Sequence, residues 1–399
     1  MQKCTKCMFP ETYETINFNN NGECNICSSN LVQKETIDWK TRKKELKKII
    51  EKYRNKSDYD CIVPYSGGKD STFQLYYLMK EFKLKPLVIR FNHGFYRNQI
   101  QDNTTTVLKK LGADFLEFTP NWKVVKNLML ESFKRKGDFC WHCHTGIFSY
   151  PMWVAIEKKI PLIFWGEKSS EYSNYYGADE EEEVDEKRFD RFINLGITSK
   201  DMYLRIDEEF GIKKLKPYTY PPKKELTAIN LRSVCLGTYI KWDVPKQSKI
   251  IMDELGWKGD EVENVPEQYN YEKIECYMQG VRDYIKYIKR GYSRPSHLVA
   301  LDLRNKKITK EKAKELVSLY EGKKPQSLNL FLDFIGLTEE QFYEVAIGHE
   351  ISPHKFQRNA NNSKKTDDFD SWSKDGGANK EETLKIFEKW KKEKEFFKN

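Results

Sequence analysis

A glycine-containing turn lies between an apolar run and a helical pattern. The apolar run at residues 61–65 predicts a short buried strand, and the turn at 66–71 reads Ser-Gly-Gly-Lys-Asp-Ser. Apolar residues at helical spacing follow from Thr72, which predicts a helix that begins at the turn. A helix N-terminus presents unpaired backbone N–H groups and the positive end of the helix dipole to an anion. The turn therefore predicts a phosphate-binding loop.

Each residue type in this turn has a use beside a phosphate. Glycines let the backbone approach without a Cβ in the way, a lysine adds a point charge, and serine hydroxyls hydrogen-bond phosphate oxygens. An aspartate suits Mg²⁺, which prefers oxygen ligands. The predicted nucleotide-binding residues of the turn are Ser66, Gly67, Gly68, Lys69, Asp70 and Ser71, of which Lys69 and Asp70 are also predicted to be catalytic.

The turn resembles the pyrophosphate loop (PP-loop) of enzymes that cleave ATP to AMP and pyrophosphate. It is not the Walker A pattern, which places its first glycine farther from Gly-Lys-Ser/Thr. The alternative is a Gly-Gly hairpin turn with a chance lysine, and the preceding strand and following helix count against it. The resemblance implies that ATP and Mg²⁺ bind here.

The elements around the turn alternate between apolar strands and helical stretches. Strands are expected at 60–65, 86–91, 114–118 and 161–165, which predicts a doubly wound parallel α/β sheet. Ligands on such sheets bind at the carboxyl ends of the strands. We therefore expect Phe91 and His93 to line the adenine and ribose, and Gly166 and Glu167 to flank the phosphates or the substrate. For His93 a solvated loop histidine is the alternative.

Four cysteines near the N-terminus form two Cys-x-x-Cys pairs, Cys4 with Cys7 and Cys24 with Cys27. Each pair can form a knuckle, and four thiolates suit a tetrahedral Zn²⁺ ion. Asn-Asn-Gly at 20–22 predicts a turn that folds the second pair back on the first. A segment this short needs a staple to fold, so metal binding also supplies its folding energy. Because four thiolates leave no open position, we expect a structural zinc site.

A second group of cysteines lies farther along the chain. Cys140 and Cys143 occur in Cys-Trp-His-Cys, and Cys235 occurs in Val-Cys-Leu-Gly. Three thiolates can hold a metal or an iron–sulfur cluster with one position open, and His142 or His144 is a candidate fourth ligand. A pair of partly buried thiols is the alternative.

Composition limits the class of protein. The 399 residues carry a net charge of +9 with 32% charged residues, a mild excess that permits an anionic partner without requiring one. Nine cysteines, an odd number, argue against a disulfide framework. No apolar run reaches the length of a membrane span, and the N-terminal residues show no apolar signal-peptide core. We therefore expect a cytoplasmic protein that does not contact the membrane.

The pattern changes after Pro217, Pro221 and Pro222. Helical stretches are expected at 223–240, 270–290, 309–320 and 338–350. A basic stretch at 34–56 is expected to form a packed helix with a solvated lysine face rather than a nucleic-acid contact. The predicted domains are a zinc knuckle at 1–32, a PP-loop ATP-binding domain at 33–215, a helical C-terminal substrate or partner domain at 216–356, and a flexible tail with a terminal helix at 357–399.

Arginines in the helical part are candidates to bind an anionic substrate, because a planar guanidinium matches phosphate and carboxylate. Ordinary surface charge is the alternative for each of them. The candidates are Arg282, Arg290, Arg294 and Arg304.

The motifs together resemble the N-acetyl sugar amidotransferases of bacterial surface-glycan, lipopolysaccharide and flagellin-glycan biosynthesis, over about residues 1–350. The blocks that carry the resemblance are Cys-Thr-Lys-Cys-Met-Phe-Pro at 4–10, Gly-Glu-Cys-Asn-Ile-Cys at 22–27, the turn at 66–71, Cys-Trp-His-Cys at 140–143, Tyr-Ile-Lys-Trp-Asp at 239–243 and Gly-Leu-Thr-Glu-Glu-Gln-Phe at 336–342.

This resemblance implies an ATP-dependent ligase that makes a C–N bond. ATP would activate the carbonyl oxygen of a sugar acetamido group, ammonia would displace AMP, and an acetamidino group would result. The sugar would be a nonulosonate of the pseudaminic or legionaminic kind, or a nucleotide-linked diacetamido uronic acid. Ammonia would come from glutaminase and ammonia-channelling subunits resembling those of histidine biosynthesis. Residue 2 is Gln2 rather than the cysteine of an N-terminal-nucleophile glutaminase, so ammonia has to be imported.

Two other functions remain open. The order of zinc knuckles, PP-loop, Cys-x-x-Cys and a later cysteine resembles tRNA 2-thiolation enzymes, in which Cys140, Cys143 and Cys235 would hold an iron–sulfur cluster. Against this, Gly-Glu-Lys-Ser-Ser-Glu at 166–171 replaces the usual Gly-His-Asn-x-Asp-Asp of those enzymes. A nucleotide-binding or tRNA-binding module without catalysis is the third possibility, and the intact turn at 66–71 counts against it.

Overall fold

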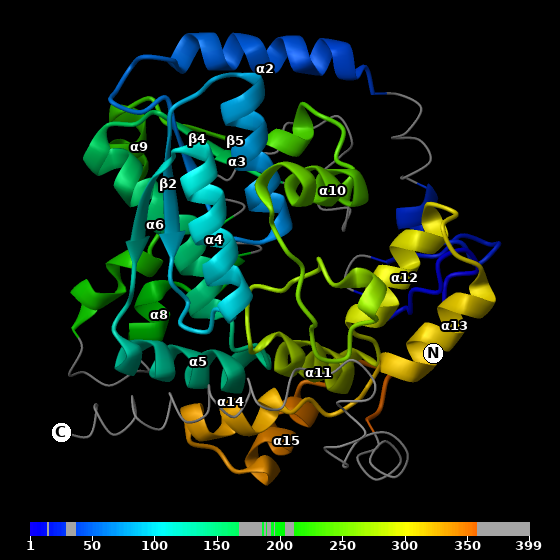
Figure 1. Ribbon diagram of the computed structural model, residues 1–399. Coiled ribbons are helices and arrows are strands. Elements are labelled where there is room, and N and C mark those ends of the chain that lie inside the picture. Colours follow the sequence, from blue (N-terminus) through cyan, green and yellow to red (C-terminus); the bar gives the residue numbers. More distant parts are fainter. Residues whose placement is uncertain are drawn as a thin grey trace. The chain divides into compact units, whose positions relative to one another are not determined.

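The computed structural model describes residues 1–13, 16–28, 37–166, 186, 189, 193–194, 196–203 and 211–356. Figure 1 shows the course of the chain. The chain divides into two compact units, which are described separately. The cysteine unit comprises Met1–Lys34, Ser132–Phe139 and Gly259–Asn399, and the sheet unit comprises Glu35–Glu131 and Cys140–Lys258. The limits of the four functional domains expected from the sequence stay predictions.

Five parallel strands form the core of the sheet unit, in the order β3-β2-β1-β4-β5. Ile62 in β1 pairs with Leu87 on one side and with Ile163 on the other. The direction of winding reverses beside β1, so the carboxyl end of β1 lies at the topological switch point, where ligands bind in such sheets. The strands are Cys61–Pro64 (β1), Pro86–Phe91 (β2), Asp114–Phe118 (β3), Leu162–Trp165 (β4) and Arg232–Cys235 (β5).

Helices cover both faces of this sheet, as right-handed crossovers between parallel strands require. Helices α3 and α4 follow β1 and β2 and contact each other, whereas α6 packs against β1, β2 and β4. The helices of the unit are α2 (Trp39–Tyr53), α3 (Lys69–Glu81), α4 (Asn98–Leu111), α6 (Trp141–Lys158), α8 (Ser199–Tyr203), α9 (Lys223–Ala228) and α10 (Val244–Leu255), with 3-10 turns η4 (Ile212–Tyr218) and η5 (Leu236–Thr238).

Helix α2 matches the expectation for the basic stretch near residue 40. Asp38 caps its N-terminus by accepting hydrogen bonds from the backbone of Lys40 and Thr41. The predicted apolar stripe is confirmed, because its buried residues are Leu46, Ile49, Ile50 and Tyr53.

The expected helix at 223–240 is wrong. Helix α9 ends at Ala228, β5 occupies Arg232–Cys235, and the 3-10 turn η5 follows. Strand β5 is the edge strand of the sheet and has only four residues, Arg-Ser-Val-Cys, which are too few to show an alternating pattern that would separate it from a helix. This strand joins β4 and extends the sheet beyond the four strands expected from the sequence.

The cysteine unit is helical after its N-terminal segment. Helix α5 (Trp122–Lys136) ends within this unit, and the ring of its Phe133 stacks on Phe342 at 5.4 Å between centroids. Helix α11 contacts α14 and α15, and α12 contacts α13. The bounds are α11 (Gln279–Arg290), α12 (Arg294–Arg304), α13 (Lys310–Tyr320), α14 (Ser327–Ile335) and α15 (Glu339–Gly348), with a 3-10 turn η6 (Glu267–Tyr269).

The predicted fold class is confirmed: a doubly wound parallel α/β sheet with an N-terminal four-cysteine segment and a helical C-terminal region. Among the described helices, none is both long and apolar enough to cross a membrane. Two expectations lie outside the described residues, the placement of Glu167 and the tail at 357–399.

Candidate active site and metal centre

The turn at 66–71 joins the carboxyl end of β1 to the first turn of α3. Gly67 has φ +85°, a conformation that residues with a Cβ rarely adopt. A Cβ there would also lie 2.9 Å from the side chains of Ile100 and Thr104 on α4. Gly68 is the N-cap of α3, and no side chain caps the helix from this position. The glycines therefore leave the start of α3 without a side-chain cap, and anion binding at this position stays a prediction.

Two serines and an ion pair complete the turn. The Ser71 hydroxyl lies 3.2 Å from the Ser66 hydroxyl and donates to the Gly68 carbonyl at 3.2 Å. The Lys69 ammonium donates to the Asp70 carboxylate at 2.8 Å, and both side chains are mostly buried. The six predicted residues of the turn are thus brought together at one end of the sheet.

Two tryptophans that the sequence analysis did not select hold this turn. Trp242 Nε1 donates to Asp70 Oδ1 at 3.3 Å, and the buried Trp257 Nε1 donates to the Gly67 carbonyl at 2.9 Å. A buried indole N–H needs an acceptor, which gives both contacts a structural reason. The only sequence signal was that Trp242 falls in the block at 239–243 that resembles the amidotransferases.

The strand ends place the other predicted ligand-binding residues as follows. Gly166 follows β4, and a Cβ on it would lie 3.8 Å from the Asp70 side chain, so Gly166 borders the turn. The Phe91 ring is buried in a core cluster, with Tyr218 at 5.6 Å between centroids. Their roles in nucleotide binding stay predictions.

His93 is buried at the end of β2, so the alternative of a solvated loop histidine is wrong. Burial, followed by the charges of His142 and Arg90, lowers the pKa of His93 to about 3. The neutral ring accepts a hydrogen bond from the Phe95 backbone through Nδ1 at 3.2 Å. His93 is therefore a neutral imidazole, shielded from solvent, near the carboxyl end of β2. Its contact with adenine or ribose stays a prediction.

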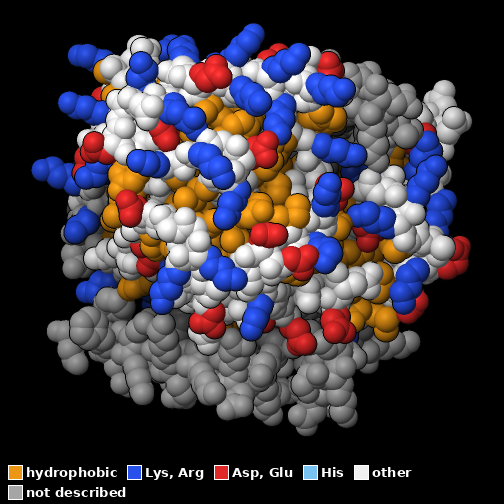
Figure 2. Space-filling view, turned by 45° about the horizontal axis from the view of Figure 1, so that its top comes forward, with side chains coloured by type: hydrophobic (Ala, Val, Ile, Leu, Met, Phe, Trp, Pro, Cys, Tyr) orange, Lys and Arg blue, Asp and Glu red, His pale blue; other side chains and the backbone are white. Residues whose placement is uncertain are grey.

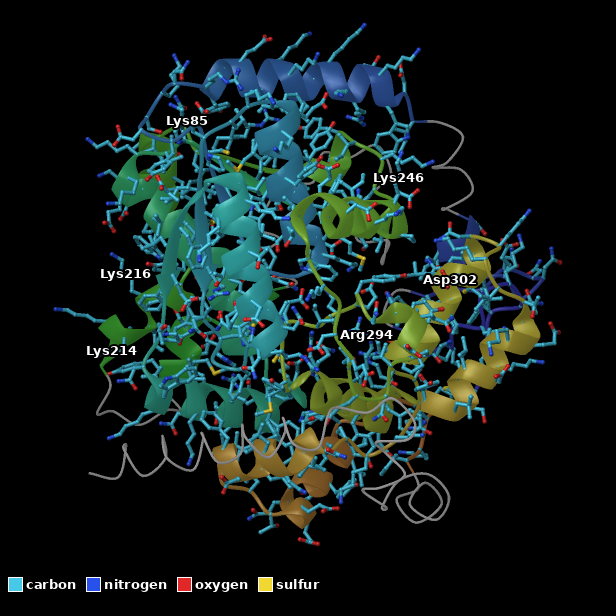
Figure 3. All side chains as sticks on the ribbon, viewed as in Figure 1. Lys85, Lys214, Lys216, Lys246, Arg294 and Asp302 are labelled. Atoms are coloured by element: carbon cyan, nitrogen blue, oxygen red, sulfur yellow. The ribbon has the colours of Figure 1, made fainter. Side chains whose placement is uncertain are left out.

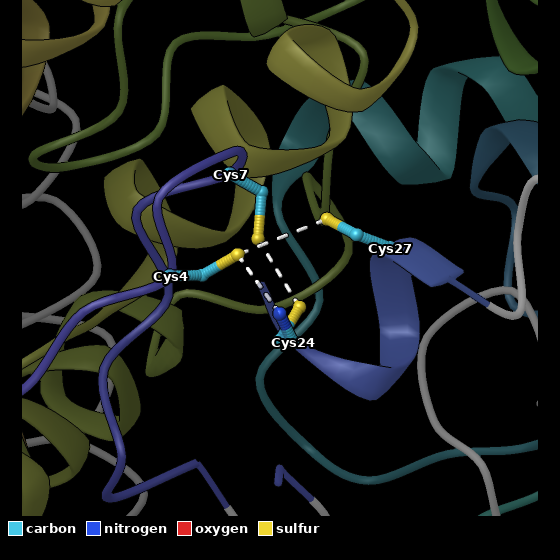
Figure 4. Close-up of side chains that lie close together, drawn as sticks. All are labelled: Cys4, Cys7, Cys24 and Cys27. Atoms are coloured by element: carbon cyan, nitrogen blue, oxygen red, sulfur yellow. Dashed lines mark hydrogen bonds between the residues drawn. The ribbon is translucent and has the colours of Figure 1, made fainter. Parts of the chain in front are cut away.

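The four N-terminal cysteines converge in the cysteine unit (Figure 4). Their sulfurs all lie within 4.8 Å of one another, with Cys4 to Cys27 at 4.0 Å and Cys7 to Cys24 at 3.6 Å. Sulfurs that surround one zinc ion tetrahedrally at about 2.3 Å are about 3.8 Å apart. The donor set and its spacing therefore fit a single metal ion rather than a larger cluster.

Local hydrogen bonds shape this metal centre. Gly22, at φ +70°, donates to the Asn19 carbonyl at 2.9 Å, which confirms the predicted turn between the two pairs. The backbone N–H groups of Lys6 and Cys24 donate to the Cys4 sulfur at 3.4 and 3.2 Å. Such N–H···S contacts favour a thiolate, the form that binds metal.

The four thiols do not ionise independently. Hydrogen bonding, first with Cys24, lowers the pKa of Cys4 and raises the pKa of Cys27. Opposite shifts within one cluster mean that the thiols share protons rather than all ionising together. A cation among them would favour all four thiolates, which is the chemistry of a structural metal site.

The second group of cysteines is not drawn together in this way. Cys140 occupies the N-cap position of α6, Cys143 lies in the first turn of that helix, and Cys235 ends β5. In the part of the chain that the structure describes, the N-terminal four cysteines are the only group of three or more histidine, cysteine, aspartate or glutamate residues whose ligand atoms lie within 4.8 Å of one another. The second metal or iron–sulfur site stays a prediction.

The fold and site thus define a doubly wound α/β protein with a glycine turn at the switch point and a four-cysteine metal centre. Residues 263–371 match the family model described as "LPS biosynthesis protein WbpG-like, C-terminal domain". This match lies in the C-terminal part of the chain and supports the resemblance to the sugar amidotransferases.

Two further proteins are similar to parts of the chain. An uncharacterised protein of Methanocaldococcus jannaschii, MJ1599, is 27% identical over 143 residues, 35% of this chain and 50% of that protein, so the match spans half of its length. The solved structure of U34-tRNA thiolase NcsA from Methanococcus maripaludis, which contains a 4Fe–4S cluster, aligns with 80% of this chain and 87% of its own. Its TM-score is 0.31 at 16% identity, so this likeness carries no argument about function.

Proposed function

We propose that this protein is an ATP-dependent amidotransferase that converts a sugar acetamido group to an acetamidino group. The carbonyl oxygen attacks the α-phosphorus of ATP, and pyrophosphate leaves. Ammonia then adds to the activated carbon, AMP departs with the former carbonyl oxygen, and a proton is released from the added nitrogen. The net reaction consumes the acetamide, ammonia and ATP and forms the amidine, AMP and pyrophosphate.

The observation that carries this proposal is the geometry of the turn at 66–71. It follows the strand at the switch point, its Gly67 has positive φ, and the N-cap Gly68 leaves the first N–H groups of α3 without a side-chain cap. Backbone N–H groups at a helix N-terminus stabilise the charge of a pyrophosphate that is leaving. A turn of this kind contributes binding and electrostatic stabilisation rather than a covalent intermediate.

The residues of the turn divide this task. Lys69 would pair with the phosphates, and Asp70 would offer a carboxylate to Mg²⁺. In the structure these two side chains pair with each other, so nucleotide and Mg²⁺ would separate a preformed pair. Trp242, which donates to the other oxygen of Asp70, keeps that carboxylate oriented while the exchange occurs.

The identity of the substrate rests on the C-terminal domain. Its family model is that of WbpG-like LPS biosynthesis proteins, which supports a sugar of a bacterial surface glycan. On the face shown in Figure 2, lysine and arginine side chains are interspersed with acidic and apolar ones, whereas a nucleic-acid-binding face typically carries a continuous basic patch. We infer a pseudaminic-like, legionaminic-like or diacetamido uronic acid sugar.

Ammonia and the metal have separate roles in this proposal. Glutaminase and ammonia-channelling partners would deliver ammonia to the activated carbon. Zinc would be held by Cys4, Cys7, Cys24 and Cys27, where it supplies folding energy and no chemistry. The protein would act in the cytoplasm, where ATP is available.

The test is pyrophosphate release from ATP and Mg²⁺ with ammonium chloride and a series of acetamido sugars, beside unmodified tRNA with sulfide. We expect sugar-dependent release and a sugar product in which NH replaces O by mass spectrometry. Release only with tRNA and sulfide would overturn the proposal in favour of tRNA 2-thiolation. ATP binding without release in either arm would favour a non-catalytic nucleotide-binding module.

A further inference from the structure

A polar cavity lies wholly within the cysteine unit. It has a volume of about 180 Å³ and is formed by the end of the segment that follows α5 and by one side of α11. Arg294, the first residue of α12, completes it and is labelled in Figure 3. The lining residues are Gly137, Asp138, Phe139, Arg282, Asp283, Ile285, Lys286, Lys289, Arg290 and Arg294.

The lining of this cavity is strongly cationic. Five of its residues are lysine or arginine and two are aspartate, an excess of three positive charges. Both aspartates already pair with arginines of the lining: Arg294 lies 3.3 Å from Asp283, and Arg282 lies 3.8 Å from Asp138. Of the four arginines predicted to bind an anion, Arg282, Arg290 and Arg294 line this one cavity. The fourth, Arg304, lies over the ring of Phe9.

Neutral groups contact two of these cations. Lys289 donates to the carbonyls of Lys136 and Gly137 at 2.7 and 3.0 Å. Lys286 lies over the Tyr292 ring, with its ammonium 4.7 Å from the centroid. Contacts of this kind hold the two ammonium groups in place beside the cavity, so each side chain loses little freedom when a ligand binds.

The metal-binding segment supports one wall of the cavity. Arg290 donates to the Thr12 carbonyl, and the Thr12 hydroxyl donates to the Arg290 carbonyl at 2.6 Å. Thr12 lies on the segment that joins the two cysteine pairs, so the metal centre and the cavity are linked through this reciprocal contact. A metal held by the four cysteines would therefore help to fix this wall of the cavity.

We infer that this cavity binds the anionic group of the sugar substrate, a carboxylate or a phosphate, an inference that rests on the proposed function. Planar guanidinium groups and ammonium groups in one concave site match such oxygens. The cavity is smaller than the roughly 300–1,000 Å³ of sites that enclose a whole ligand. It would therefore anchor the charged end of the sugar and leave the acetamido group outside.

The test is calorimetric binding to the intact, metal-loaded chain. Saturating Mg²⁺ and a non-hydrolysable ATP analogue fill the glycine turn, so that phosphates do not bind there. The probes are N-acetylneuraminate with a carboxylate, UDP-N-acetylglucosamine with a diphosphate, and neutral N-acetylglucosamine. Binding of either anionic probe but not of the neutral one is expected, and the probe that binds identifies the source of the anion.

Two variants and one matched control locate the binding. Arg282→Gln and Lys286→Gln each remove one charge from the lining, and each should weaken binding of the anionic probe by about tenfold. Lys312→Gln removes the same charge from α13, away from the lining, and should bind as the unchanged chain does. Melting curves and metal content check that each variant is folded, and either folded variant suffices for the test.

The outcomes separate this inference from the proposed function. If neither anion binds, or if both variants bind it as tightly as Lys312→Gln, the cavity is not an anion site. If binding is lost in the variants although no acetamido sugar gives an amidine, the cavity binds anions and the proposed reaction fails. If amidine forms with an unchanged KM in both variants, the reaction stands and the inference about the cavity fails.

Discussion

The four-cysteine metal centre and the site at the carboxyl end of the sheet draw their residues from the chain in opposite ways. The metal centre draws its four sulfurs from the first 27 residues, and short-range backbone hydrogen bonds hold its turns. The site at the carboxyl end of the sheet combines the turn at 66–71 with Gly166, Trp242 and Trp257, which lie far along the chain. A region closed by local contacts can be recognised from spacing alone, because loop closure between near neighbours costs little entropy.

The difference also separates two kinds of role. Metal at the four cysteines would act through folding, since all four ligand positions are taken by protein. The carboxyl end of the sheet presents backbone N–H groups, a lysine and a carboxylate beside the topological switch point, where side chains can act on a ligand. Changes in the first region should therefore alter stability, and changes in the second should alter activity.

The largest expected effect is on the metal centre. Cys4→Ser should abolish metal binding and lower the melting temperature strongly, because structural zinc contributes on the order of 10 kcal/mol to small domains. Metal analysis and thermal melting measure this. Cys276→Ser, a cysteine of the same unit outside the four, is the matched control and should keep its metal. Unchanged metal content in Cys4→Ser would refute the site.

The next effect is on the glycine turn. Lys69→Ala should reduce pyrophosphate release by about 10²–10³-fold, as the loss of a charge that stabilises a transition state does. Metal content should not change. Lys80→Ala, at the exposed end of the same helix α3, is the control and should retain activity. A melting temperature that falls as far as activity does would show that Lys69 is structural instead.

A smaller effect is expected where distant residues hold the turn. Trp257→Phe removes the N–H that donates to the Gly67 carbonyl and leaves that carbonyl with the longer contact from the Thr72 hydroxyl at 3.5 Å, and the lost hydrogen bond costs about 1 kcal/mol. We expect weaker binding of an ATP analogue in calorimetry together with a lower melting temperature. Trp39→Phe on α2 is the control. Equal nucleotide affinity in the two variants would mean that Trp257 does not position the turn.

The smallest effect is expected at the second group of cysteines. Cys143→Ser should leave sugar-dependent pyrophosphate release within about threefold of the unchanged chain, because ammonia rather than sulfur is the proposed nucleophile. Metal at the N-terminal four should also be unaffected. Loss of activity together with loss of iron from protein prepared without oxygen would make Cys140, Cys143 and Cys235 part of the mechanism.

Much of the fold followed from pattern. Strands β1 to β4 and the start of α3 are within one or two residues of where the sequence placed them. Each of them combines a run of apolar residues with a clear boundary. Strand β5 and helices α10, α12 and α14 were missed. Helix α14 is apolar on most sides, and Arg-Ser-Val-Cys in β5 is too short to show a period. For such segments the neighbours decide the structure, and the sequence does not show which neighbours they will have.

By itself the sequence determined the metal centre and the strand–turn–helix unit at 66–71. Both depend on residue types a few positions apart, on cysteine spacing and on glycine at positive φ. Only the tertiary structure decided that Trp242 and Trp257 hold the turn and that His93 is shielded from solvent. It also decided that residues 137–139 and the cationic side of α11 line one cavity. These contacts join segments that are distant in the chain, and packing of the complete core selects them.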